Sequence, residues 1–116
     1  MPKANRVEKL NMLLCETIST VIDREVEFPP DFFITITHVM TSRDLRYSTV
    51  FISVLNQHHG KALEILNKHI YDIQQQINRM LRMRPVPKIR FAIDEQELRR
   101  EAVEKSLAAV KQRGEI

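Results

Sequence analysis

The hydrophobic residues of this chain follow two different periods in turn, and this order constrains the fold more than any other feature. Between about Asn5 and Arg24, apolar residues recur at steps of three and four, which is the spacing of one helix face. The same spacing returns from Leu63 to Leu81, and Pro85 then denies the chain helical hydrogen bonds. The pattern therefore predicts two amphipathic helices, of which the second is the longest element.

Between these helices, and again after the second one, the hydrophobic period is two. Thr35 and Thr37 alternate with isoleucines in the segment 32–39, and a second alternating segment runs over 49–54. Turn-forming residues at 41–44 separate the two segments, which favours a hairpin whose turn is capped by Asp44. A third alternating segment, 88–94, follows the prolines. The connection across the second helix is long enough for this third strand to pair parallel to a hairpin strand.

The order helix, strand, strand, helix, strand predicts an α+β sandwich in which helices cover one face of a three-stranded sheet. A chain of 116 residues has room for about one ordinary domain. We expect residues 1–94 to form that domain. Residues 95–116 are rich in charge and carry only a weak apolar stripe, so we expect a marginal helix or a mobile tail there.

The composition excludes several classes of protein. No apolar stretch is long enough to cross a bilayer, and the first residues lack the hydrophobic region of a signal peptide. The single cysteine, Cys15, can form no internal disulfide, which fits a reducing cytoplasm. We therefore expect an unexported, cytoplasmic protein that has no membrane partner.

Positive charge is concentrated around the end of the second predicted helix. No acidic residue lies between Asp72 and Asp94, so nothing in this interval of the sequence neutralises its basic residues. Two of them share one polar stripe of the helix with Lys68 and Gln75, opposite the apolar stripe. Guanidinium groups suit phosphate oxygens, and several together gain affinity by displacing counterions. The candidate RNA-binding residues are Arg79, Arg82, Arg84, Lys88 and Arg90, with Lys3, Arg6, Arg43 and Arg46 as peripheral contributors.

Other interpretations of these residues remain open. An ordinary solvated helix face would carry the same charges, and a formal net charge of +3 is too small to decide. Tyr47 and Phe51 could stack bases, although cross-strand packing is the commoner role of aromatic residues on a strand. Asp44 has no nucleophile, second carboxylate or glycine loop as a companion, so we expect no enzyme activity. His58 and His59 lack the partners that a zinc motif needs, and we expect no metal and no cofactor.

Five segments follow one another in a specific order and spacing, and they are Arg6-Val7, Thr35–Val39, Ser42–Leu45, Val50–Val54 and, most clearly, Arg82–Asp94. Together these segments resemble the ribosome-binding factor A family. The resemblance implies a KH-like fold of type II topology that binds small-subunit ribosomal RNA and free small subunits. It also implies a non-catalytic role in late subunit maturation, in rRNA processing and in growth in the cold. We expect a monomer without a small-molecule substrate. No single segment is decisive, but their order and spacing together make the resemblance specific.

The chain departs from the family pattern at two places. The segment 69–71 stands where members usually carry an Ala-x-Gly interruption, which leaves open a continuous or differently bent second helix. Ser48 stands where a small apolar alanine is usual, so it needs a local hydrogen-bond partner. With only Gly60 and Gly114, the chain cannot build the Gly-x-x-Gly loop by which ordinary KH domains hold RNA. Charge and shape must replace that loop. The alternative is a protein-interaction module that uses a sheet edge or the tail of the same sandwich.

Overall fold

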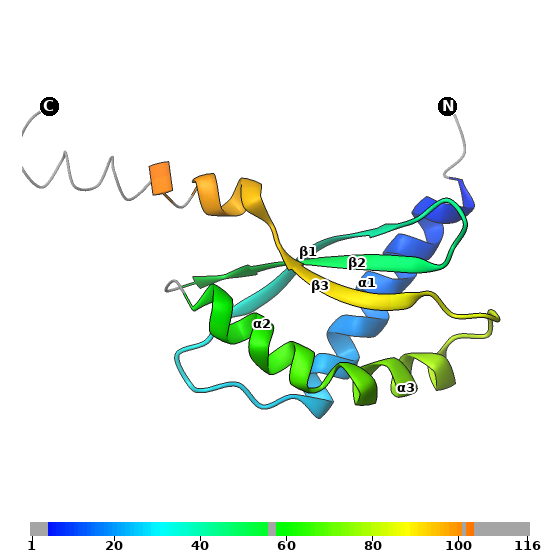
Figure 1. Cartoon of the computed structure of the whole chain (residues 1–116), viewed down its shortest axis with the longest axis horizontal. Helices are drawn as coiled ribbons and strands as arrows, with labels where there is room; N and C mark the ends of the chain where they lie inside the picture. The colour runs from blue at the N-terminus through cyan, green and yellow to red at the C-terminus, as the bar shows by residue number, and fades with distance from the viewer. Residues whose placement is uncertain (1–4, 56–57, 101, 104–116) are drawn as a thin grey trace, which may run out of the picture.

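The computed structural model describes residues 5–55, 58–100 and 102–103 of the chain (Figure 1). The element order confirms the predicted α+β class, and residues 95–100 and 102–103 are helical as well. The named elements are α1 (Arg6–Glu25), β1 (Ile34–Thr41), β2 (Tyr47–Val54), α2 (His59–Lys68), α3 (Ile70–Met80) and β3 (Lys88–Ile93).

The first helix, α1, begins and packs as its sequence pattern predicts. The Asn5 side chain accepts a hydrogen bond of 2.8 Å from the Glu8 backbone N–H, which satisfies a donor that the first helical turn leaves free. With 20 residues, α1 is longer than either α2 or α3, so the prediction that the second helix is the longest element is wrong. Its apolar stripe lies in the core and consists of Leu10, Leu14, Ile18, Val21 and Ile22.

The second predicted helix is divided into α2 and α3 at His69, whose φ of −102° and ψ of 6° depart from helical values. The His69 backbone N–H donates to Leu66 O at 3.1 Å instead of to Ile65 O, four residues back. The His69 ring takes over that carbonyl, since its Nδ1 lies 2.9 Å from Ile65 O. The helix is therefore interrupted without the Ala-x-Gly sequence, and the continuous helix that the sequence left open is excluded.

The sheet has the strand order β1-β2-β3. β1 and β2 form the predicted antiparallel hairpin, and β3 pairs parallel to β2, with Tyr47 opposite Lys88 and Ile52 opposite Ile93. Because α2 and α3 supply the long crossover between these two strands, the parallel pairing that the sequence allowed is confirmed. A consequence is that β2 and β3 begin at the same end of the molecule.

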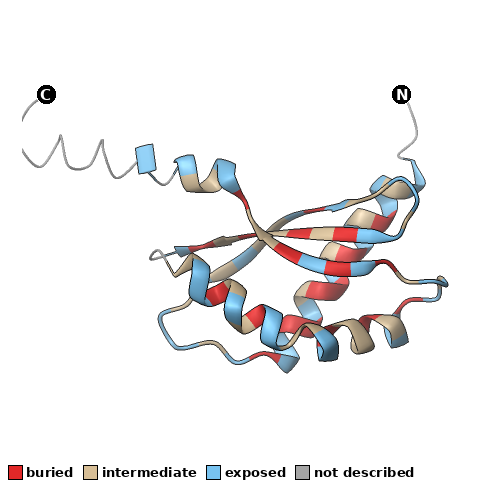
Figure 2. Ribbon diagram, viewed as in Figure 1, coloured by how far each residue is buried: buried red, intermediate tan, exposed pale blue. Residues whose placement is uncertain are grey.

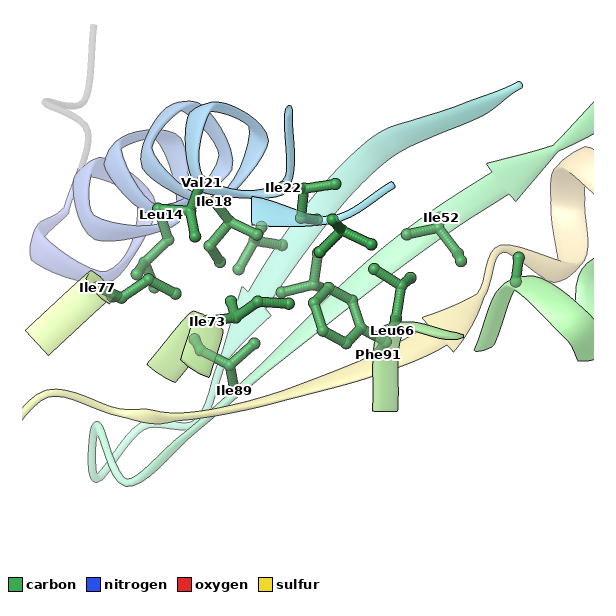
Figure 3. Close-up of a cluster of buried hydrophobic side chains, with 14 of the residues drawn as sticks. Leu14, Ile18, Val21, Ile22, Ile52, Leu66, Ile73, Ile77, Ile89 and Phe91 are labelled. Carbon is green, nitrogen blue, oxygen red and sulfur yellow. The ribbon is translucent and has the colours of Figure 1, made fainter. Parts of the chain in front are cut away.

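One face of the sheet packs against the helices, and the core lies between these two layers (Figures 2 and 3). Along β2, buried residues alternate with more exposed ones, and Figure 3 shows Ile52 of β2 and Phe91 of β3 pointing toward Leu66 of α2. Ser48 is the polar member of this buried set, and its Oγ lies 2.7 Å from Thr41 Oγ1, which is the local partner that the sequence required.

The second face of the sheet carries the side chains that alternate with the buried ones. In the ranges that the structure describes, the named helices lie on the first face only, so helices cover one face of the sheet as predicted (Figure 1). We call the second face the open face. Its side chains include His38, Tyr47, Thr49, Phe51, Lys88 and Arg90.

Candidate nucleic-acid interface

The parallel pairing of β2 and β3 brings most of the predicted basic residues to one end of the molecule. The Lys88 backbone N–H donates to Arg46 O at 2.8 Å, which joins the start of β3 to the turn before β2. The first turn of α1, the last turn of α3 and the α3–β3 connection lie at this same end (Figure 1). Lys3 lies outside the described residues. We call the remaining set the basic end: Arg6, Arg43, Arg46, Arg79, Arg82, Arg84, Lys88 and Arg90.

The prediction that Arg79 and Arg82 share one helix stripe with Lys68 and Gln75 is wrong. Of the four residues assigned to that stripe, only Gln75 and Arg79 lie on α3, because Lys68 ends α2 and Arg82 follows α3. The chain leaves the helix at Leu81, which is extended, with φ −90° and ψ 142°. The basic end is therefore assembled from two helix ends, two connections and one strand, so its charges spread over a broad surface.

Acidic side chains are few at the basic end, where the described residues include Glu8 in the first turn of α1 and Asp44 in the turn before β2. Glu27 and Asp31 lie in the connection that follows α1, which runs away from the α3–β3 connection (Figure 1). Among the described residues, the ion pair recorded at the basic end joins Arg46 Nε to Asp44 Oδ2 at 3.7 Å, with both side chains more than half exposed. Such a pair contributes little to stability. The positive charge at the basic end is thus largely uncompensated.

Asp44 shapes the turn between β1 and β2, as the sequence predicted. Its Oδ1 accepts hydrogen bonds from the Ser42 hydroxyl at 2.7 Å and from the Arg46 backbone N–H at 3.1 Å. The hydrogen bond from Ser42 is the largest cause that holds the pKa of Asp44 below its ordinary value, and the one from the Arg46 N–H is the next largest. Leu45 has a φ of 61°, so the turn depends on this left-handed residue. The carboxylate therefore fixes the backbone that carries Arg43 and Arg46.

Arg84 differs from the other basic residues because part of its guanidinium group is used within the protein. Its Nη1 donates to Leu81 O at 2.8 Å and to Met83 O at 2.6 Å. These bonds hold the connection between α3 and β3, which lies outside the helices and strands. Arg84 thus positions the connection that carries Arg82. This role does not depend on whether its other guanidinium N–H groups contact RNA.

Gln74 ties β3 to α3, and the sequence analysis missed this residue. Its Nε2 donates to Pro87 O at 3.0 Å and to Asn78 Oδ1 at 3.1 Å, while its Oε1 accepts from the Ile89 backbone N–H at 2.9 Å. β3 is an edge strand, so these bonds satisfy groups that no neighbouring strand could pair. In a run of three consecutive glutamines, 74–76, the sequence gave no sign that Gln74 alone reaches the sheet.

Other groups of polar residues lack the geometry of a reactive site. In residues 5–55, 58–100 and 102–103, no three His, Cys, Asp or Glu side chains lie close enough together to hold a metal ion. His58 stacks on Phe32 with ring centroids 4.5 Å apart, and its Nε2 lies 3.2 Å from Asp31 Oδ2. Within the same residues, no helix is long and apolar enough to cross a membrane.

Comparisons with known proteins agree with the sequence resemblance. Residues 6–107 match the family model of ribosome-binding factor A. The chain belongs to the ribosome-binding factor A family. It is 38% identical over 92 residues to ribosome-binding factor A of Natranaerobius thermophilus, covering 78% of this chain and 70% of that relative. It is 39% identical over 93 residues to the Protochlamydia amoebophila protein of the same name, covering 78% of this chain and 71% of that relative.

Solved structures share the fold, which confirms the KH-like architecture. The crystal structure of ribosome-binding factor A from Thermus thermophilus has a TM-score of 0.67 and 24% identity, covering 75% of this chain and 93% of that one. The solution structure of a Thermotoga maritima protein has a TM-score of 0.68 and 28% identity, covering 79% of this chain and 90% of that one. A homology model of the Thermus thermophilus factor, fitted into a cryo-electron-microscopy map of a 30S complex, has 24% identity and a TM-score of 0.63, covering 72% of this chain and 90% of that one.

Proposed function

We propose that this chain is a non-catalytic assembly factor of the small ribosomal subunit, and that it binds ribosomal RNA through the basic end. The observation that carries the proposal is the basic end itself, where eight Arg and Lys residues from two helix ends, two connections and one strand stand against Glu8 and Asp44. Membership of the ribosome-binding factor A family supports the same assignment. The Thermus thermophilus factor fitted into a map of a 30S complex adds a family precedent.

The chemistry of the basic end suits an RNA backbone. Exposed guanidinium groups form charge-assisted hydrogen bonds with phosphate oxygens, and each phosphate contact releases condensed counterions. The chain has no Gly-x-x-Gly loop with which to clamp the RNA backbone, so charge and shape must supply the affinity. Positive charge gathered at one end also orients the protein as it approaches a polyanion. Binding of this kind depends steeply on salt and weakly on sequence.

On this proposal, the factor acts in the cytoplasm as a monomer, on free small subunits rather than on complete ribosomes. It assists late maturation and rRNA processing, and it supports growth in the cold. A sedimentation gradient of cell extract tests the partner: the factor should migrate with free small subunits and leave them as salt is raised. Migration with complete ribosomes, or with neither particle, would contradict the proposal. If the factor stays with the small subunits at high salt, the result would instead favour binding through an apolar protein interface.

A further inference from the structure

Aromatic side chains line the open face of the sheet, and the basic-end proposal assigns these rings no role. Tyr47 is 46% exposed, and the His38 side chain is 47% exposed. Phe51 is half-buried on the same strand as Tyr47, four positions further along, which places it about 13 Å away at the rise of an extended strand. A row of aromatic rings on an exposed sheet is unusual, since such rings are more often covered by packing.

Two pairs of groups on this face are already arranged as flat platforms. The rings of His38 and Phe51 stack with centroids 4.4 Å apart and an interplanar angle of 13°. The Arg90 guanidinium lies 5.7 Å from the centre of the Tyr47 ring, and Arg90 Nε donates to Thr49 Oγ1 at 2.9 Å. These partners already hold the rings and the guanidinium in place. A base that stacks on them therefore binds at a small cost in side-chain entropy.

A β-bulge places the His38 ring on this face. The register of β1 shifts between Ile36, which pairs with Ile52, and His38, which pairs with Phe51. The Thr37 hydroxyl in the bulge donates to Asp94 Oδ2 at 2.7 Å. Without the extra residue, the alternation along β1 would turn His38 toward the helices. The irregularity thus brings the His38 ring onto the open face beside Phe51.

A hollow of about 360 Å³ adjoins the His38–Phe51 pair. Residues 92–96 form its other wall, which includes the Asp94 carboxylate. Carboxylate and backbone oxygens at such a wall can accept hydrogen bonds from the amino groups of a base. The opposite side of the open face carries Lys88 and Arg90, which continue the positive charge of the basic end.

From these observations, we infer that the open face binds a single-stranded segment of ribosomal RNA, whose bases stack on Tyr47 and on the His38–Phe51 pair. The inference rests on the proposed function and deepens it by naming the form of the RNA. Charge complementarity selects this occupant, because Lys88 and Arg90 can meet phosphates while the rings meet bases. A duplex keeps its base faces stacked inside the helix, so it cannot use these platforms.

Tyrosine emission can test this inference site by site. The chain has two tyrosines and no tryptophan, and Tyr71 lies 72% exposed on α3, in the layer away from the open face. The Tyr71→Phe variant leaves Tyr47 as the only tyrosine, and the Tyr47→Phe variant leaves Tyr71 while keeping a ring for stacking. The probe is a single-stranded oligoadenylate of about ten nucleotides, within the usual site size of such surfaces. We expect saturation with the probe to remove most of the Tyr47 emission and to leave the Tyr71 emission unchanged.

Loss of a stacking ring should weaken the complex without changing its electrostatics. In the otherwise unaltered chain, Tyr47→Leu and Phe51→Leu should each weaken oligoadenylate binding between about 5-fold and 150-fold, the range for one stacked base. The salt dependence should keep the slope of the parent protein, because no phosphate contact is removed. Thermal unfolding of each Leu variant shows whether the fold is retained. The emission measurement does not depend on the Leu variants, because Tyr71→Phe and Tyr47→Phe both keep an aromatic ring at position 47.

The contrary outcomes are distinct. If the basic end binds small subunits while the probe leaves Tyr47 emission unchanged, the open face is not the site, and the proposed function stands. If neither subunits nor probe bind, both proposals fail. Tyr47 emission that changes with protein concentration alone would assign the face to a second copy of the chain and overturn the inference. If acrylamide fails to quench Tyr47 emission before RNA is added, a terminal segment of the chain itself covers the open face. That result would also overturn the inference.

Discussion

Thr37 and Asp94 are 57 positions apart in the sequence, and the Thr37 hydroxyl donates a hydrogen bond of 2.7 Å to the Asp94 carboxylate. This contact joins the bulge of β1 to the first residue after β3, across the width of the sheet. Asp94 Oδ1 also accepts from the Gln96 backbone N–H at 3.0 Å, so the carboxylate caps the helical residues that follow. A single buried side chain thus links the two outer strands and the start of the C-terminal segment.

The Asp94 contact predicts an acid-sensitive part of the stability. The Thr37 hydroxyl, and after it the backbone N–H groups of Glu97 and Gln96, hold the pKa of Asp94 below its ordinary value of 3.8, although burial opposes them. A lowered pKa means that the ionised carboxylate stabilises the fold above about pH 4, and that this contribution is lost as pH falls through the folded-state value. We expect Asp94→Asn to lower the free energy of unfolding by about 1 kcal/mol at neutral pH, with the difference shrinking in acid.

Urea unfolding at several pH values measures this effect. Thr37→Val should raise the pKa of Asp94 toward its ordinary value, whereas Thr37→Ser keeps the hydroxyl and should behave like the parent protein. A stability difference between Asp94→Asn and the parent that is independent of pH would contradict the assignment.

Gln74 predicts a stability difference between neighbouring glutamines of α3. Gln74→Leu leaves the Ile89 N–H and the Pro87 carbonyl without their partner at the edge strand, so it should cost about 1 to 3 kcal/mol in the free energy of unfolding. Gln75→Leu is the matched control, because it makes the same chemical change at the next position. Equal effects of the two substitutions on urea unfolding would show that the bonds of Gln74 contribute nothing particular.

Hydrophobic periodicity was sufficient to predict the elements because the core is built on it. The stripe that contains Leu14 and Ile18 marks α1, and alternation around Val50 and Ile52 marks β2. Periodicity cannot locate the break at His69, since the apolar stripe continues from Leu66 to Ile73 across it. The break depends instead on a side chain that competes for a backbone carbonyl.

The candidate site was harder to predict than the fold, for a physical reason. Arg79 and Arg82 stand out in the sequence because no acidic residue lies near them, but only the parallel pairing of β3 brings Lys88, later in the same basic run, next to Arg46. The contacts of Thr37 with Asp94 join residues that no local pattern relates. Long-range pairing decides such neighbours, and it has no signature in a single sequence.

The boundary between the predicted domain and the tail leads to a truncation experiment. Every buried apolar residue of the described core precedes Asp94, so a chain that ends at Asp94 should keep a cooperative unfolding transition. The helical residues 95–100 attach through Asp94, where the Leu98 backbone N–H donates to Asp94 O at 3.2 Å. Loss of cooperative thermal unfolding in the shortened chain would show that this segment belongs to the core.

The basic end predicts that charges at one end of the molecule, rather than the net charge, determine affinity for the small subunit. We would replace Arg43, Arg79 and Arg82 by Gln, because these side chains are exposed and lie outside the open face, and would leave Arg84, which holds its own connection. Stability should change by no more than about 0.5 kcal/mol for each exposed substitution. Loss of three phosphate contacts should weaken binding and flatten the salt slope by about two to three.

The control removes the same number of charges elsewhere, by replacing Lys61, Arg99 and Arg100 with Gln. All three are exposed and lie outside the basic end, so they lower the net charge equally without touching the proposed surface. We expect this variant to keep nearly the salt slope of the parent protein, since only phosphates in direct contact release their counterions. Equal losses of affinity in the two variants, measured by titration of purified small subunits, would show that net charge drives binding and that the basic end has been wrongly assigned.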